Sequence, residues 1–145
     1  MAVNIFVGAE FFDELRKSGC YYVDKTELIH GLVQMNKSKV TLFTRPRRFG
    51  KTLTMTMLES FFDIRRDSRA VFEGLDIMKH EELCGEWMNR YPVLFITLKD
   101  AEALRFETAY AKLKTILADL CKRHEYLRNS EPELFMAVQN RTGTD

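Results

Sequence analysis

The feature that most constrains the fold of this chain is an apolar run that enters a basic turn ending in Gly50, Lys51 and Thr52. The run covers residues 40–44 and is rich in β-branched and aromatic side chains, which favour an extended strand. Apolar residues at helical spacing begin directly after Thr52. A strand, a turn ending in Gly-Lys-Thr and a helix, in this order, have the layout of a phosphate-binding loop.

Each residue at the end of this turn has a chemical role in such a loop. Gly50 would let backbone N–H groups approach phosphate oxygens, and the first turn of the helix would add partial positive charge. Lys51 would reach the β- and γ-phosphates as the catalytic residue, and Thr52 would bind Mg²⁺ through its hydroxyl. One position departs from the usual G-x-x-x-x-G-K-[ST] pattern, because Arg45 stands where the first glycine is expected.

Composition excludes several other classes of protein. The 145 residues are 46% hydrophobic and 30% charged, which is typical of a globular domain. A net charge of +1 is too small for a general polyanion-binding surface, so nucleic acid would have to bind a local patch. The three cysteines are isolated, and the three histidines (His30, His80 and His124) lack ligand spacing, so neither a disulfide framework nor a zinc site is expected.

The N-terminal segment has no basic region, and no apolar run approaches the roughly 18 residues that a membrane span needs. We therefore expect a cytoplasmic protein without membrane association.

Hydrophobic periodicity predicts an α/β fold. Strands are expected at about 40–44 and 93–98, parallel to each other and flanked by helices. Helices are expected at 9–18, 27–36, 52–65, 81–89, 103–127 and 132–138. The order of these expected elements predicts one domain over residues 9–128, followed by a short helix and polar tail over residues 129–145.

Three segments carry a resemblance to a known family. Residues 21–29, 40–52 and 91–100 resemble the bacterial AAA-ATPase-like family, also called predicted AAA-ATPases. The loop R-P-R-R-F-G-K-[ST] is specific to that family, so Arg45 is the residue expected there. The resemblance covers about residues 11–127 and corresponds to the N-terminal portion of the family.

The resemblance implies a P-loop NTPase fold of the additional-strand type that binds ATP and Mg²⁺. Many family members also carry a restriction-nuclease-like domain further on. By analogy with related ATPases, Tyr22 or the backbone of Val23 would contact the adenine. The alternative is that Tyr21, Tyr22 and Val23 are ordinary strand packing, with Asp24 as a helix cap. The expected nucleotide-binding set is therefore Tyr22, Val23, Arg47, Arg48, Phe49, Gly50, Lys51, Thr52 and Leu53.

The chain also departs from the family pattern. Family members have a later apolar strand ending in Asp-Glu, whose carboxylates help to hold Mg²⁺, and residues 1–145 do not contain it. Asp100 is the alternative metal-holding acid within the chain. We therefore expect ATP binding with little or no hydrolysis by this chain alone, and self-association through exposed sheet edges.

A second function stays open from the residues alone. Arg45, Arg47, Arg48 and Lys51 form the densest basic cluster in the chain. Such a turn suits a non-catalytic module that binds nucleic acid or another anion, since arginine is well matched to phosphate. Phe49 is the aromatic residue within this cluster, and we expect it to anchor the loop to the core.

Overall fold

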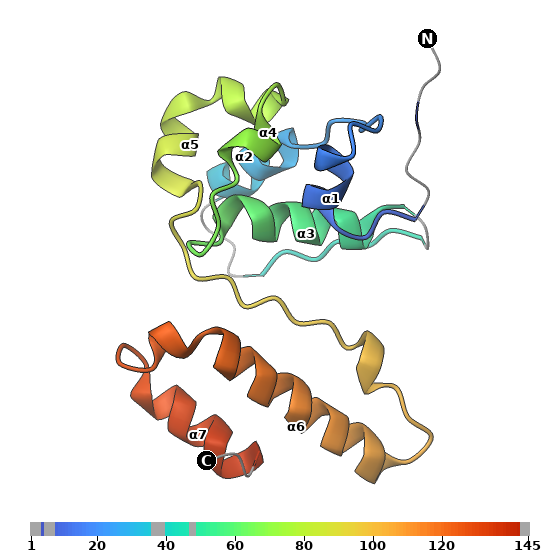
Figure 1. Cartoon of the computed structure of the whole chain (residues 1–145), viewed down its shortest axis with the longest axis vertical. Coiled ribbons are helices and arrows are strands. Elements are labelled where there is room, and N and C mark those ends of the chain that lie inside the picture. The colour runs from blue at the N-terminus through green and yellow to red at the C-terminus, as the bar shows by residue number, and fades with distance from the viewer. Residues whose placement is uncertain (1–3, 5–7, 36–39, 47–48, 143–145) are drawn as a thin grey trace. The chain divides into compact units, whose positions relative to one another are not determined.

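The structure is a computed structural model that describes residues 4, 8–35, 40–46 and 49–142, except for the side chain of Asp100. The chain divides into two compact units, Met1–Val93 and Leu94–Asp145. The described helices of the first unit are α1 (Phe12–Lys17), α2 (Glu27–Gln34), α3 (Lys51–Phe62), α4 (Arg69–Phe72), the 3₁₀ helix η1 (Asp76–Lys79) and α5 (Glu81–Trp87). Those of the second unit are η2 (Lys99–Ala101), α6 (Phe106–Arg123), η3 (Glu125–Leu127) and α7 (Pro132–Thr142), as Figure 1 shows.

The expected α/β fold is wrong, because the described residues form helices and no strand or sheet. Residues 40–44 and 93–98, the two expected parallel strands, are neither helical nor part of a ladder. One isolated parallel bridge joins Asp63 to Tyr91, with the N–H of Ile64 donating to the Tyr91 carbonyl at 2.8 Å. β-Branched residues favour an extended backbone locally, but a strand also requires a hydrogen-bonded neighbour.

The additional-strand P-loop fold that the resemblance implies is wrong for the same reason, since the described residues form no strand. Val40 and Leu42 are 81% and 82% exposed, so this face of the 40–44 segment is not covered. The sheet edges expected to cause self-association are therefore not formed by the described segments, and self-association itself stays a prediction.

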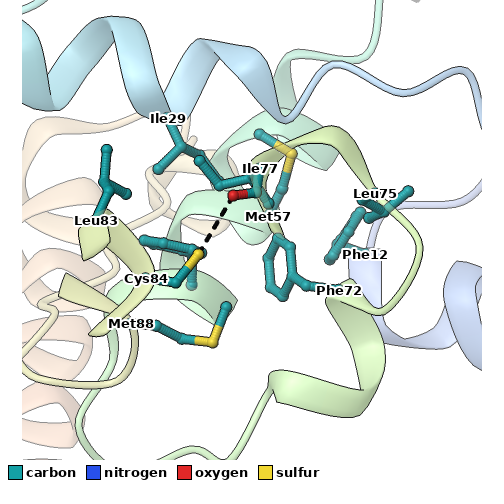
Figure 2. Close-up of a cluster of buried hydrophobic side chains, with 10 residues drawn as sticks. Phe12, Ile29, Met57, Phe72, Leu75, Ile77, Leu83, Cys84 and Met88 are labelled. Atoms are coloured by element: carbon teal, nitrogen blue, oxygen red, sulfur yellow. Dashed lines mark hydrogen bonds between the residues drawn. The ribbon is translucent and has the colours of Figure 1, made fainter. Parts of the chain in front are cut away.

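Aromatic side chains from three helices form the centre of the first unit. Phe12 of α1, Phe61 of α3 and Phe72 of α4 are all fully buried, and the ring of Phe72 lies 5.0 Å from that of Phe12 and 5.4 Å from that of Phe61. Ile29 of α2 and Ile77 of η1 extend this cluster, as Figure 2 shows. The periodic apolar positions of α2 and α3 thus face a common core, as their spacing predicts.

A buried thiol links two further elements of this core. The Cys84 Sγ–H donates to the backbone carbonyl of Ile77 at 3.3 Å, the dashed line in Figure 2. Burial raises the pKa of the Cys84 thiol above its ordinary value. This cysteine is therefore a packing residue of α5 and not a reactive nucleophile.

Thr56 attaches the start of α1 to α3. Its hydroxyl accepts the backbone N–H of Phe12 at 3.2 Å and lies 3.0 Å from the carbonyl of Glu10, to which it donates. These contacts satisfy an N–H at the beginning of α1, where no helical partner exists. They also hold Glu10 beside the middle of α3.

In the second unit α6 and α7 pack against each other. Leu120 and Phe135 are buried, and the guanidinium of Arg128 lies over the Phe135 ring at 5.7 Å. The helices expected at 103–127 and 132–138 are confirmed as α6 and α7, with shifted ends. Across the described residues, no helix combines the length and apolarity needed to cross a membrane.

Candidate nucleotide-binding site

The basic turn ends in a glycine whose conformation starts α3. Gly50 has φ 72° and ψ 25°, in the left-handed region, and its carbonyl accepts the N–H of Thr54 at 2.8 Å. A side chain at this position would be strained, although a Cβ would meet no atom within 4 Å. Glycine is thus required here by the backbone angle and not by lack of space.

The side chain of Lys51 folds back over the turn from which it comes. Its Nζ donates to the backbone carbonyl of Arg45 at 2.5 Å and to that of Pro46 at 3.0 Å. Lys51 itself is exposed. The ammonium group is therefore held at the mouth of the loop by neutral acceptors, which a more strongly bound anion could replace.

The N-terminus of α3 has no negative group of its own to neutralise it. Gly50 supplies no side-chain cap, and the first turn contains no acidic residue. The amide groups of Lys51, Thr52 and Leu53 are the first three of the helix and have no intrahelical acceptor. Thr52 is exposed, while Leu53 packs partly against the core. The arrangement favours an anion at this end of α3.

A cleft of about 1030 Å³ brings the two halves of the expected site together. Phe49, Gly50, Lys51, Thr52 and Leu53 line one part of it, and Tyr21, Tyr22, Val23 and Lys25 line another. Glu10 is the acidic residue among the described lining residues, beside the two lysines. Seven of the nine expected residues therefore lie at one cleft. The other two, Arg47 and Arg48, fall outside the described residues.

Tyr22 packs inward, as the alternative of ordinary packing predicts for it. Its hydroxyl lies 3.4 Å from the Met57 sulfur, and its ring meets that of Phe12 edge to face at 5.4 Å. Burial raises the pKa of the Tyr22 hydroxyl, the largest influence on it. Its neighbours Tyr21 and Val23 are 63% and 57% exposed at the cleft.

Tyr21 also lines this cleft, although the expected set does not include it. The signal for it was available, because successive side chains of an extended segment point to opposite faces. A packed Tyr22 therefore implies that Tyr21 and Val23 share the open face. The backbone N–H of Tyr21 donates to the carbonyl of Asn4 at 2.8 Å, which fixes this segment.

Phe49 does not anchor the loop to the core, contrary to expectation. It is 61% exposed and lines the cleft next to Gly50. Asp100, the alternative metal-holding acid, belongs to the second unit, and its side chain is outside the described residues. A metal-binding role for Asp100 therefore stays a prediction.

Comparisons with known proteins agree with the resemblance seen in the loop. A family model described as "Predicted AAA-ATPase" matches residues 6–143. An "Uncharacterized protein in vnfD 5'region" from Azotobacter chroococcum mcd 1 is 33% identical over 116 residues, or 76% of this chain. The matched region is 20% of that relative's length, so the chain spans about a fifth of it. No solved structure gives a significant match.

Proposed function

Because the chain belongs to the predicted AAA-ATPase family, we propose that its first unit binds a nucleoside triphosphate, ATP in the first instance, in the cleft beside α3. One observation carries the proposal. The left-handed Gly50, the exposed Lys51 and the exposed Val23 all line the same cleft.

The residues present fit the phosphates and a magnesium ion. The phosphates would receive N–H groups from the first turn of α3 and the ammonium of Lys51, in place of the carbonyls of Arg45 and Pro46. The Thr52 hydroxyl would bind Mg²⁺, which would neutralise phosphate charge when bound. The uncapped and acid-free helix start supports this assignment.

The base would lie against the exposed side of the 21–23 segment. Tyr21 and Val23 offer apolar surface there, whereas Tyr22 is committed to the core. Contacts of this kind bind a planar ring without selecting strongly among bases. We therefore expect weak selectivity among bases. We assign the preference for a triphosphate to Lys51.

The exposure of Phe49 favours a second candidate function. Phe49 lies beside two exposed cationic residues, Arg45 and Lys51. An exposed aromatic ring within a basic turn is what a single-stranded nucleic acid binds, by stacking and by phosphate contacts. In this alternative the turn is a non-catalytic module for nucleic acid or another polyanion.

Calorimetric titration with ATP–Mg²⁺ tests the first proposal. Wild type should bind one equivalent, and Lys51→Ala should bind more weakly by about 1.5–3 kcal/mol, since charge-assisted hydrogen bonds are lost. This is roughly a 10- to 150-fold loss of affinity. Lys17→Ala is the matched control, because Lys17 is an exposed lysine of α1 that does not line the cleft.

Competition separates the two functions. Nucleotide binding should prefer triphosphate over monophosphate and respond to Lys51→Ala. Nucleic-acid binding should weaken steeply with salt and respond to Arg45→Ala and Phe49→Ala. Equal ATP affinity in wild type and Lys51→Ala would contradict the nucleotide proposal.

A further inference from the structure

Two histidines that are 50 positions apart in the sequence stack face to face in the first unit. The rings of His30 and His80 are 4.1 Å apart between centroids and within 8° of parallel. His30 belongs to α2, and His80 lies between η1 and α5. The separation of these residues in the sequence hid this pairing.

A carboxylate lies against both imidazoles. Glu27 Oε1 is 2.8 Å from His80 Nε2, and Glu27 Oε2 is 3.7 Å from His30 Nδ1. Glu27 and His30 are one turn apart on α2, so they share a face of that helix. One donor atom from each of the three residues lies within 4.8 Å of the other two.

We propose that Glu27, His30 and His80 form a binding site for a divalent transition-metal ion, with Zn²⁺ as the best match. Two imidazole nitrogens and one carboxylate oxygen are the donor set of three-ligand zinc sites, in which solvent completes the coordination. The site is separate from the nucleotide cleft, since none of its residues lines that cleft.

The backbone around the site is already held in place. The N–H of Ile77 donates to the buried hydroxyl of Thr26 at 3.1 Å, and the N–H of Asp76 donates to Asp24 at 2.7 Å. Both bonds join η1 to the start of α2. They bring the chain segments of His80 and Glu27 together before any ion binds, as the supporting contacts of metal sites do.

Side-chain freedom allows the donors to close on an ion. Zinc ligands in a tetrahedral site lie about 3.4 Å from one another, given bonds of about 2.0–2.2 Å. The side chains of His30, His80 and Glu27 are 35%, 32% and 54% exposed. Binding of one ion by both imidazoles requires the rings to turn out of their stacked arrangement, because each nitrogen lone pair lies in its ring plane, and the partial exposure of these side chains leaves room for that turn.

The local charge also favours a cation. A cleft of about 550 Å³ includes His30 and His80, and among its described lining residues Glu81, Glu82 and Glu86 accompany one lysine, Lys79. Lys79 is itself paired with Asp76 at 2.5 Å. Among the described residues, the two imidazoles thus lie beside more carboxylates than ammonium groups, a charge balance that favours a cation.

Zinc titration of the metal-free 145-residue chain, without an affinity tag, tests the proposal. Wild type should bind one equivalent and melt at a higher temperature with Zn²⁺, because binding to the folded state alone stabilises it. His30→Ala, His80→Ala and Glu27→Gln should each weaken binding by at least about tenfold, the lower limit of what even outer-shell partners cost.

Glu82→Gln is the matched control for Glu27→Gln. Both changes remove one negative charge near the same site, but only Glu27 is a proposed ligand, so Glu82→Gln should keep most of the affinity. Cys20 is a partly exposed cysteine of the first unit and is not a proposed ligand, so Cys20→Ser should bind Zn²⁺ normally. With Co²⁺ in place of Zn²⁺, the absorption spectrum should show no thiolate charge-transfer band, because no cysteine binds the ion. Equal affinity of Glu27→Gln and Glu82→Gln, or loss of binding in Cys20→Ser, would overturn the proposal.

Discussion

The carboxylate of Asp24 accepts the backbone N–H of Asp76 at 2.7 Å, across 52 positions of sequence. The other carboxylate oxygen accepts both the N–H and the hydroxyl of Thr26, at 2.8 Å and 2.7 Å. The sequence suggests Asp24 as a local helix cap, yet its main role is to join the start of α2 to η1. It thereby helps to position Glu27 and His80, two of the three proposed zinc ligands.

The first prediction concerns this carboxylate. In Asp24→Asn an NH₂ group replaces one of the two accepting oxygens, and the charge-assisted hydrogen bonds are lost. The free energy of unfolding should therefore fall by about 1–3 kcal/mol. Urea unfolding followed by the fluorescence of Trp87, the single tryptophan, measures the first unit. Asp67→Asn is the control, because Asp67 is exposed. Equal losses in both variants would contradict the role of Asp24.

The second prediction is the pH dependence of the first unit. Burial alone would raise the pKa of Asp24, but the hydrogen bonds from Asp76 and Thr26 outweigh it and hold that pKa below its ordinary value. Burial is likewise outweighed at Asp63, where Arg65 and Arg66 lower the pKa. Both carboxylates therefore release their protons more readily in the folded state.

The sign of the pH effect follows from these two shifts. An unfolded aspartate has a pKa of about 3.9, so below about pH 5 the unfolded chain takes up protons before the folded one does. Their contribution to stability should be complete near neutral pH and should be lost as pH falls through the lowered folded pKa values. Unfolding free energies from pH 7 to pH 3 should fall less steeply in Asp24→Asn, and an unchanged slope would contradict the assignment.

The third prediction compares two glycines with equal space and different backbones. A Cβ would meet no atom within 4 Å at Gly50 or at Gly85, but only Gly50 has a positive φ. Gly50→Ala should cost about 1–2 kcal/mol through left-handed strain. Gly85→Ala, inside α5, should gain about 0.5–1 kcal/mol. Thermal unfolding of both variants measures the contrast, and two changes of the same sign would contradict it.

The fourth prediction concerns Asn89, a non-glycine residue with φ 54°. Its amide donates to the carbonyls of Ser60 and Asp63 at 3.1 Å and 2.9 Å, and its side-chain oxygen accepts the N–H of Ser68 at 3.0 Å. The Asn89 side chain, which follows α5, thus bridges the end of α3 and the start of α4. Asn89→Ala should lose them all and should destabilise the first unit by about 2–4 kcal/mol.

Asn89→Gly separates the two parts of that effect. Glycine removes the backbone strain while losing the same hydrogen bonds, so its cost should be smaller than that of alanine by about 1 kcal/mol. Urea unfolding compares the two variants directly. If alanine were no worse than glycine, the left-handed backbone at Asn89 would carry no cost.

The helices could be read from the sequence, but the sheet could not. Apolar spacing predicts α2, α3 and α6 because each pattern is local to its own segment. The same kind of evidence predicts extended backbone at 40–44 and 93–98, but pairing depends on a second segment being adjacent. The described residues supply no such pairing, so the predicted sheet is wrong.

The amino-acid sequence by itself determined the chemistry of the turn. Glycine at position 50 is needed for the left-handed start of α3, and Lys51 follows it at the first helical position, because these requirements are local to the backbone. The tertiary structure alone decided that Tyr22 faces the core while Val23 faces the cleft, and that His80 meets His30. Those arrangements depend on long-range hydrogen bonds and packing, such as the bond from Asp76 to Asp24, which no local pattern reveals.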